Sequence, residues 1–337
     1  MVGADVSWSR RLAATTVACA LLAAGSLNAW AAGTTFTVGD PRVSSAHGLA
    51  SDSDRDVYWT SNLSGAGRIL ALNSDGSSAG VVTFPSRTTS VQAVAYRENR
   101  VYLGDIGDAN SSREFVTVYR LGTLTYGGQS NYNAWDFTYP DGPQDAAAML
   151  VSPRGNIYIV TRGATAAIYR APSNLSSERP NRLNRVATAP SWVTDGTFLD
   201  AQRMALRTYT GVILVDAFTF ETVASSILPE QYAGESLTTS PDGLGLMAGS
   251  SLPASDVLAV AIPTRLATLP AAPSVAPTSA PPATASATPS GTATASASAS
   301  TGAEATEAGP RRTGTFLALG AALLLSVAAA AVVALKR

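Results

Sequence analysis

The chain has 337 residues, of which 46% are hydrophobic and 14% charged, and its formal net charge is −1. A single cysteine and a single histidine exclude a disulfide-stapled scaffold and a zinc site built from Cys and His side chains. Because the chain has no excess of positive charge, it also lacks the electrostatic signature of a protein that binds nucleic acid.

Residues 1–32 have the pattern of a secretory signal peptide. Arg10 and Arg11 supply positive charge, an apolar stretch follows them, and Ala29-Trp30-Ala31 matches an A-x-A cleavage site. Cys19 lies inside the apolar stretch, and the residues before it match a lipoprotein signal poorly. We therefore expect an exported protein whose mature chain contains no cysteine.

Residues 33–267 are dominated by short β-prone runs separated by Gly, Asp, Asn, Pro and Ser, with few helix signals. One pattern occurs repeatedly: a strand of small residues, a turn, a second strand and a third strand. The small-residue strands are expected at 48–50, 93–95, 148–150, 196–198 and 236–238, and the second strands at 57–59, 101–103, 157–159, 204–206 and 245–247.

Repeats of about 46 residues with four strands each are typical of β-propellers. We predict an all-β fold, a β-propeller of five four-stranded blades, with six blades as the alternative. Fourth strands are expected at 80–84, 134–139, 183–187 and 222–227. The last repeat has none, and residues 35–38 near the N-terminus are predicted to supply it and so close the ring.

Two further segments follow the repeats. Residues 268–312 are rich in Ala, Pro, Ser and Thr, a composition that cannot bury enough apolar surface to fold, so they are predicted to be a disordered stalk. Residues 313–337 include an uncharged run from Thr315 to Leu335 that is long enough to cross a bilayer as a helix. We expect an extracellular propeller anchored in the cell membrane by a C-terminal transmembrane helix.

The repeats align at one position near the beginning of each small-residue strand. These positions hold His47, Gln92, Ala147, Asp195 and Glu235, most of which are polar. The innermost strands of a propeller converge around its axis, so this alignment predicts a polar channel mouth that binds a small-molecule or protein ligand. The alternative is structural, because polar residues at strand ends commonly cap turns. The expected ligand-binding residues are His47, Gln92, Asp195, Arg207 and Glu235.

Carboxylates that meet at such a mouth repel one another and need a cation, and oxygen ligands without Cys or His clusters suit Ca²⁺. The run Gly104-Asp105-Ile106-Gly107-Asp108 is either a metal- or phosphoryl-binding loop or a turn stabilised by its Asp side chains. His47 is the only histidine and the sequence has no G-x-S-x-G motif, so a Ser-His-Asp hydrolase is disfavoured.

Over residues 45–250 the chain resembles a family of secreted bacterial β-propeller proteins that is distantly similar to propeller phytases and esterase-like phytase relatives. The resemblance rests on short motifs in several repeats. They are Gly104 to Asp108 with Arg113 and Tyr119-Arg120; Tyr139-Pro140-Asp141-Gly142 followed by Asp145-Ala146-Ala147-Ala148; Thr194-Asp195; Arg207-Thr208-Tyr209; and Gly234-Glu235-Ser236.

The resemblance implies an acidic, cation-binding channel mouth. Three positions depart from the family pattern. Ala147 replaces a glutamate, Gln92 stands where an acidic residue is expected, and Ala109 replaces the asparagine after the Gly104–Asp108 run, although Asn110 follows it directly. A carboxylate-rich metal site loses affinity as its ligand charge falls. The metal ligands that the resemblance implies are Asp105, Asp108, Asp145, Asp195 and Glu235.

These patterns predict a cell-surface binding or interaction module that is a degenerate relative of hydrolytic propellers. One alternative is a working Ca²⁺-dependent phosphoesterase or esterase that uses the retained carboxylates. Another is a structural envelope protein whose propeller rim binds a second protein. The expected partners are the membrane and a ligand at the propeller face, and nucleic acid is not among them.

Overall fold

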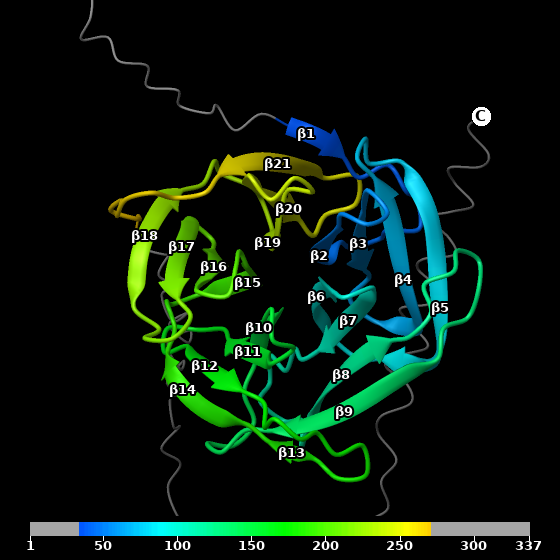
Figure 1. Cartoon of the computed structure of the whole chain (residues 1–337), viewed down its shortest axis with the longest axis horizontal. Coiled ribbons are helices and arrows are strands. Elements are labelled where there is room, and N and C mark those ends of the chain that lie inside the picture. Colours follow the sequence, from blue (N-terminus) through cyan, green and yellow to red (C-terminus); the bar gives the residue numbers. More distant parts are fainter. Residues whose placement is uncertain (1–33, 271–337) are drawn as a thin grey trace, which may run out of the picture. The chain divides into compact units, whose positions relative to one another are not determined.

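In the computed structural model of the chain, residues 34–270 are described, and every regular element among them is a β-strand. These strands form five sheets around a central axis (Figure 1). Within residues 34–270 there is no helix that could cross a membrane. The predicted signal peptide (1–32), the transmembrane helix (313–337) and all but the first three residues of the predicted stalk (268–312) lie outside the described residues.

Each sheet is one blade, and its strands pair antiparallel from the axis outward. Blade 1 consists of β2 (His47–Asp52), β3 (Val57–Ser61), β4 (Gly65–Asn73) and β5 (Ser78–Thr88). Blade 2 consists of β6 (Val91–Arg97), β7 (Arg100–Asp105), β8 (Val116–Leu121) and β9 (Tyr132–Thr138). Blade 3 consists of β10 (Ala146–Val151), β11 (Ile157–Thr161), β12 (Ala167–Arg170) and β14 (Asn184–Thr188). Blade 4 consists of β15 (Val193–Phe198), β16 (Arg203–Thr208), β17 (Gly211–Asp216) and β18 (Thr222–Ile227).

Blade 5 shows how the ring closes. It contains β19 (Gly234–Thr239), β20 (Gly245–Ser250) and β21 (Asp256–Ala261), and its outer strand is β1 (Thr34–Thr37) from the other end of the described chain. β1 pairs antiparallel with β21, and Phe36 packs on Tyr58 of blade 1 with ring centroids 5.2 Å apart. The predicted five blades and N-terminal closing strand are confirmed, and the six-blade alternative is wrong.

The hydrophobic core is divided among the five contacts between neighbouring blades. Each cluster of buried apolar side chains draws on two adjacent blades, including the cluster that joins blade 5 to blade 1. A middle strand such as β11 is buried along its whole length, since both faces of its blade are covered. This is why the second strands read as continuous apolar runs rather than alternating ones.

The small residues of the inner strands follow from the crowding near the axis. Gly48 at the beginning of β2 has a φ of +71°, and a Cβ there would lie 2.3 Å from the backbone nitrogen of Val94 in the next blade. Any larger residue would therefore both strain the backbone and push two inner strands apart. The taper of the ring explains the pattern that the sequence repeats at this position.

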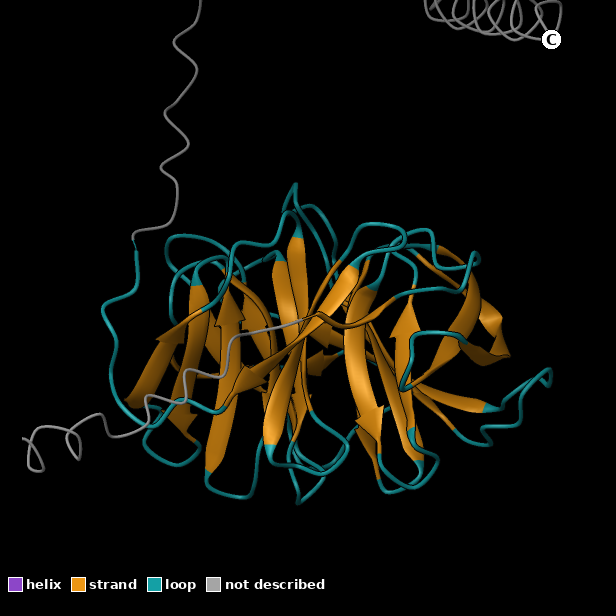
Figure 2. Ribbon diagram, turned by 90° about the horizontal axis from the view of Figure 1, so that it is seen from above, coloured by secondary structure: helices purple, strands orange, loops and turns teal. Residues whose placement is uncertain are grey.

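The inner strands define two faces of the propeller. At the start face the inner strands begin and the second strands end, as in the pairing of His47 with Ser61. The loops between blades and the loops between second and third strands also lie there. The opposite face, the end face, contains the hairpins that join the first strand to the second and the third strand to the fourth. Loops lie on both faces of the ring of strands (Figure 2).

Two features lie outside the regular repeat. β13 (Asn181–Arg182), in the connection between β12 and β14, pairs parallel with β9 and so links blade 3 to the outer edge of blade 2. After β21, the chain runs beside β18, where Ser225 donates hydrogen bonds to the carbonyl groups of Arg265 and Ala267. Leu269 packs against the core between blades 3 and 4.

Candidate functional site

Every inner strand begins with a β-bulge at the same place. In each blade the register between the first and second strands shifts by one residue near the start face. A bulge inserts one unpaired residue and redirects its side chain, and bulges are frequent beside functional sites. The extra residues are Gly48, Gln92, Ala147, Thr194 and Glu235.

The bulges correct the sequence alignment at two of its five positions. Gln92, Ala147 and Glu235 are equivalent, as predicted, but His47 precedes the bulge of blade 1 and Asp195 follows the bulge of blade 4. Side chains alternate along a strand, so a shift of one residue changes the direction in which a side chain points. His47 and Asp195 therefore do not occupy the same position in their blades as Gln92 and Glu235.

Arg162, directly after β11 of blade 3, links blades across the channel mouth. Its Nη2 donates a hydrogen bond of 2.6 Å to Oε1 of Gln92 in blade 2 and lies 3.5 Å from Oε2 of Glu235 in blade 5. Its Nε lies 3.9 Å from a carboxylate oxygen of Asp145. Blades 3 and 5 are not neighbours in the ring, so the guanidinium group reaches across the axis.

Asp145 and Glu235 are the accessible carboxylates of this mouth, with side-chain exposures of 25% and 15%. Burial raises the pKa of Glu235, and the positive charges of Arg162 and Arg207 partly oppose that rise. The mouth thus holds one arginine beside two carboxylates, so the guanidinium group balances one of the two negative charges.

His47 lies close enough to Arg162 to be affected by its charge. Burial, and secondarily the positive charge of Arg162, lower the pKa of His47 to about 4. Its Nδ1 atom is buried and has no hydrogen-bond partner within residues 34–270. The imidazole is therefore neutral at physiological pH and is a weak base, which suits ligand contact better than proton transfer.

Asp195 and Arg207 are not at the mouth surface, because both are almost completely buried. They face one another across β15 and β16 and connect blade 4 to blade 5. Asp195 accepts a hydrogen bond from the backbone N–H of Leu237, and Arg207 donates to the carbonyl groups of Ser236 and Gly249. Burial raises the pKa of Asp195 and lowers that of Arg207 to about 10.

The side chain of Arg207 extends toward blade 5 and leaves no room for a side chain at the first position of the Gly234-Glu235-Ser236 motif. A Cβ on Gly234 would lie 2.1 Å from Nη2 of Arg207. The same Nη2 donates a hydrogen bond to the side chain of Gln231, in the loop before β19. Arg207 and Asp195 therefore fasten two blades together, which is a structural use of residues predicted to bind a ligand.

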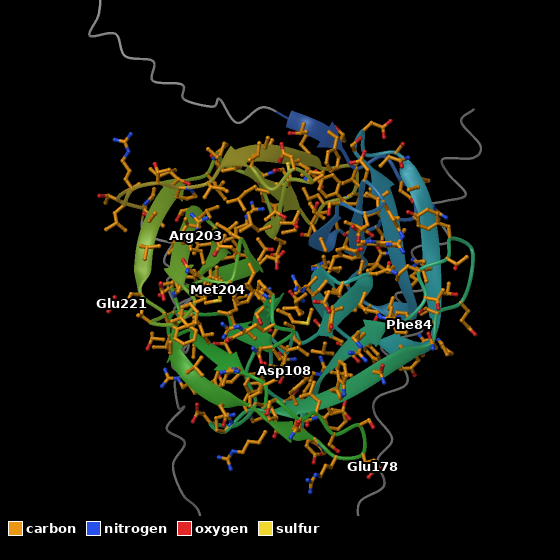
Figure 3. The ribbon with its side chains drawn as sticks, in the orientation of Figure 1. Phe84, Asp108, Glu178, Arg203, Met204 and Glu221 are labelled. Atoms are coloured by element: carbon orange, nitrogen blue, oxygen red, sulfur yellow. The ribbon has the colours of Figure 1, made fainter. Side chains whose placement is uncertain are left out.

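The two aspartates of the Gly104–Asp108 run also have internal partners. Asp105 accepts hydrogen bonds from the backbone N–H groups of Thr89 and Ser90 and pairs with Arg113 at 3.0 Å. Asp108 accepts from the backbone N–H groups of Ser112 and Arg113. Asp108 lies nearer the axis than Glu178 and Glu221 at the outer edge of the disc (Figure 3). Of the two readings of this run, these contacts fit the turn stabilised by Asp side chains.

These partners bear on the predicted Ca²⁺ ligands. Within residues 34–270 no three Asp, Glu, His or Cys side chains are arranged so that they could hold a metal ion together. Of the five predicted ligands, Asp105, Asp108 and Asp195 are buried and accept backbone hydrogen bonds, and Asp145 accepts one from the N–H of Asp108. Since Arg162 lies between Asp145 and Glu235, the residues present do not fit a Ca²⁺ site in this arrangement.

The loops of the start face also present exposed apolar side chains. They come from loops of four different blades, and Tyr232 is the most exposed at 82%. Tyr209 contacts Trp192, which lies in the preceding loop of the same face. Exposed aromatic side chains such as Tyr209 and Tyr232 are frequent anchors of protein interfaces. The exposed apolar residues of this face are Leu63, Phe115, Tyr209, Tyr232 and Leu252.

The residues predicted from the sequence to bind a ligand did not include Arg162. Its partners Gln92 and Glu235 are 70 and 73 positions away in the numbering, so no local spacing reveals the contact. The bulge at Thr194 was missed for a different reason, since a bulge adds one residue without changing the hydrophobic pattern of the strand.

No family model and no curated protein matches the sequence. Among solved structures, a gluconolactonase from Xanthomonas campestris is similar, with 12% identity and a TM-score of 0.42 over 65% of this chain and 87% of that chain. A luciferin-regenerating enzyme is similar at 9% identity and a TM-score of 0.40, covering 66% and 94% of the two chains. A protein from Thermus thermophilus, described as an oxidoreductase (glucose dehydrogenase), has 11% identity and a TM-score of 0.41, covering 68% and 98%. At these identities the likeness concerns the fold alone, and the chain's own strand pairing defines it as a five-bladed β-propeller.

Proposed function

We propose that the chain is an exported, membrane-anchored binding module that engages a protein partner through the start face of its propeller. The observation that best supports this is the pairing of Arg162 with Glu235 and Gln92 across the axis. A metal-dependent hydrolase needs its cation near such a position, to activate water and to screen the charge of the substrate. Here a protein side chain supplies the positive charge instead.

The remaining polar groups support binding rather than hydrolysis. Asp105 and Asp108 each accept backbone hydrogen bonds on both carboxylate oxygens, and Asp195 is completely buried, which keeps all three from a substrate at the surface of the mouth. The lowered pKa of His47 makes it a poor general base at neutral pH. Asp145 and Glu235 are left as accessible acids, and both are paired with Arg162.

The start face has the composition of a protein-binding surface. Exposed Tyr, Phe and Leu side chains lie in loops of the same face as a mouth that combines a guanidinium group, carboxylates and an amide. Aromatic residues contribute disproportionately to the energy of protein interfaces, and polar groups at the centre fix the orientation of the partner. The stalk and transmembrane helix expected from the sequence would display this face outside the cell.

The proposal is tested by site-specific crosslinking with a matched control on the other face. Tyr232 on the start face and Leu244 on the end face have nearly equal exposures of 82% and 79%. A photoreactive phenylalanine analogue at position 232 of the full-length chain, in the cells that produce it, is expected to yield one discrete protein adduct, and the same analogue at position 244 is expected to yield none.

The crosslinked partner then allows a direct measurement of affinity. The substitution Tyr232→Ser should weaken its binding by about tenfold or more, as loss of an aromatic anchor typically does, whereas Leu244→Ser should leave binding unchanged. Equal adducts from both positions, or equal affinities of the two variants, would refute a partner site on the start face.

The Ca²⁺-dependent phosphoesterase or esterase remains the alternative, favoured by the partial exposure of Asp145 and Glu235. It predicts Ca²⁺-dependent turnover of phosphomonoesters or carboxylic esters by the full-length chain and its abolition by Glu235→Gln. The binding-module proposal predicts no such turnover, with or without Ca²⁺.

A further inference from the structure

A cavity of about 140 Å³ lies on the axis, in the half of the channel that opens toward the end face. All five inner strands line it, through residues in their later halves such as Ser51 of β2 and Arg97 of β6. Each inner strand is the edge strand of its sheet, so one side of its backbone faces the channel without a strand partner. Such edges supply polar groups that need water or a ligand.

The charge of this cavity has one sign. Among residues 34–270, Arg97 is the only charged residue in the lining, and no aspartate or glutamate contributes to it. Nη2 of Arg97 donates to the carbonyl oxygen of Pro153, which draws the guanidinium group from blade 2 toward blade 3. Its other acceptor is the carboxylate of Glu98, which is 75% exposed outside the cavity and therefore screened by water.

Arg97 retains unused donors. Its Nε is buried without a partner, and within residues 34–270 its Nη1 forms no hydrogen bond. A buried N–H that is left unpaired costs free energy, which a bound acceptor would recover.

Hydroxyl groups from other blades add further donors to the same cavity. Among the described residues the buried Oγ of Ser51 has no partner, and Oγ1 of Thr238 accepts the N–H of Ser51, which leaves the Thr238 O–H free to donate. Within the described part of the chain, the Thr197 hydroxyl forms one hydrogen bond, a long one of 3.5 Å to the carbonyl of Phe198. The side chains around the cavity thus offer an arginine and three hydroxyl groups, and the carboxylate that pairs with the arginine, Glu98, lies outside the lining.

We propose that this end of the channel binds a small oxyanion on Arg97 and the hydroxyl groups of Ser51, Thr197 and Thr238. A single positive charge in a partly enclosed cavity favours an anion, and charge-assisted hydrogen bonds to arginine are the strong ones. The volume limits the ligand, because a water molecule occupies about 30 Å³ of liquid and the cavity holds only a few such volumes. Inorganic phosphate or a short carboxylate meets both requirements. The site lies on the opposite face from the proposed partner surface and does not depend on it.

Calorimetric titration of the purified full-length chain with inorganic phosphate tests this site. Ionic strength is matched with KCl, so that a general salt effect is separated from binding. The wild-type chain should bind phosphate with saturable heat and a higher unfolding temperature. Arg97→Gln should weaken binding by about tenfold or more, since a charged hydrogen-bond donor is removed.

Two further variants keep the test decisive. Arg154→Gln removes an exposed arginine from a hairpin of the same face that does not line the cavity, and it should bind phosphate like the wild type. Ser51→Ala removes one hydroxyl without a charge change and should weaken binding by about threefold, within the effect of one hydrogen bond. Absence of saturable binding to the wild type, or equal binding by Arg97→Gln and Arg154→Gln, would overturn the proposal.

Discussion

Arg162 and Arg207 both lie beside carboxylates near the axis, but their burial gives them different parts in the molecule. Arg207 is only 1% exposed and donates hydrogen bonds to backbone carbonyl groups of the next blade, so it belongs to the scaffold. Arg162 is 20% exposed and pairs with side chains from three blades, so it can still exchange those partners for a ligand. The degree of burial, rather than the residue type, therefore distinguishes a structural arginine from one that is available to bind a ligand.

The low pKa of His47 has a consequence for stability in acid. Its pKa is about 4 in the folded protein, against an ordinary value of 6.5. The unfolded chain therefore takes up a proton first, and the folded state loses stability relative to it as the pH falls from about 6.5 to about 4. Above pH 6.5 both states are neutral at this position and no pH dependence remains.

The substitution His47→Gln should remove this acid sensitivity. The free energy of unfolding of the wild type is expected to fall relative to that of the variant by on the order of 2–3 kcal/mol between pH 6.5 and pH 4. The raised pKa values of Asp195 and Glu235 act in both proteins and cancel in the difference. Parallel stability curves for the two proteins, measured by urea unfolding, would show that His47 does not titrate as stated.

At the scale of the elements, β1 completes blade 5 with only four residues. Its energetic contribution is concentrated in Phe36, which is 4% exposed and packs in the cluster between blades 5 and 1. Thr35, its neighbour in the same strand, is exposed. One strand thus offers both a buried and an exposed position at the closure of the ring.

Phe36→Ala should reduce the free energy of unfolding by about 3–5 kcal/mol, as deletion of a buried phenyl ring does. For a domain of this size that lowers the unfolding midpoint by more than about 6 °C. Thr35→Ala should change it by less than about 0.5 kcal/mol. Scanning calorimetry of the full-length chain compares the two, and similar small losses in both would mean that β1 does not close the ring.

The strands were predictable because their signals are local. Small residues on inner strands and continuous apolar runs on second strands recur at regular spacing, and β18 follows its prediction at both ends. β13 left no such signal, since two residues that pair parallel with another blade form no pattern of their own. The bulges at Gly48 and Thr194 displaced His47 and Asp195 from the predicted ring without altering the repeat.

At the scale of the whole molecule, five blades bring residues from distant parts of the chain to one axis. The start face gathers Gln92, Arg162 and Glu235 from blades 2, 3 and 5, and the end face gathers Ser51, Arg97 and Thr238 from blades 1, 2 and 5. A sequence predicts which residues stand near the axis, but not which of them meet across it. The charged groups that meet at each end of the channel could therefore be identified only from the three-dimensional structure.

The central claim is that Arg162 supplies the positive charge at the start face, so that the mouth needs no metal ion. The decisive measurement is the thermal unfolding of the full-length wild type and of Arg162→Met, each after chelation and then with millimolar Ca²⁺. The wild type should show no Ca²⁺-specific rise. In the variant, Asp145 and Glu235 lose the guanidinium group that pairs with them. Its free energy of unfolding should fall by about 1–3 kcal/mol, so it should unfold at a lower temperature than the wild type.

Millimolar Ca²⁺ should then restore part of that loss in Arg162→Met, since two freed carboxylates and the amide of Gln92 form a weak oxygen site. Ca²⁺ at ten times its Kd would return about 1.4 kcal/mol, equivalent to a rise of a few degrees in the midpoint. The same rise in the wild type, with Arg162 in place, would contradict this claim. It would mean that the mouth binds Ca²⁺ as a metal-dependent propeller does.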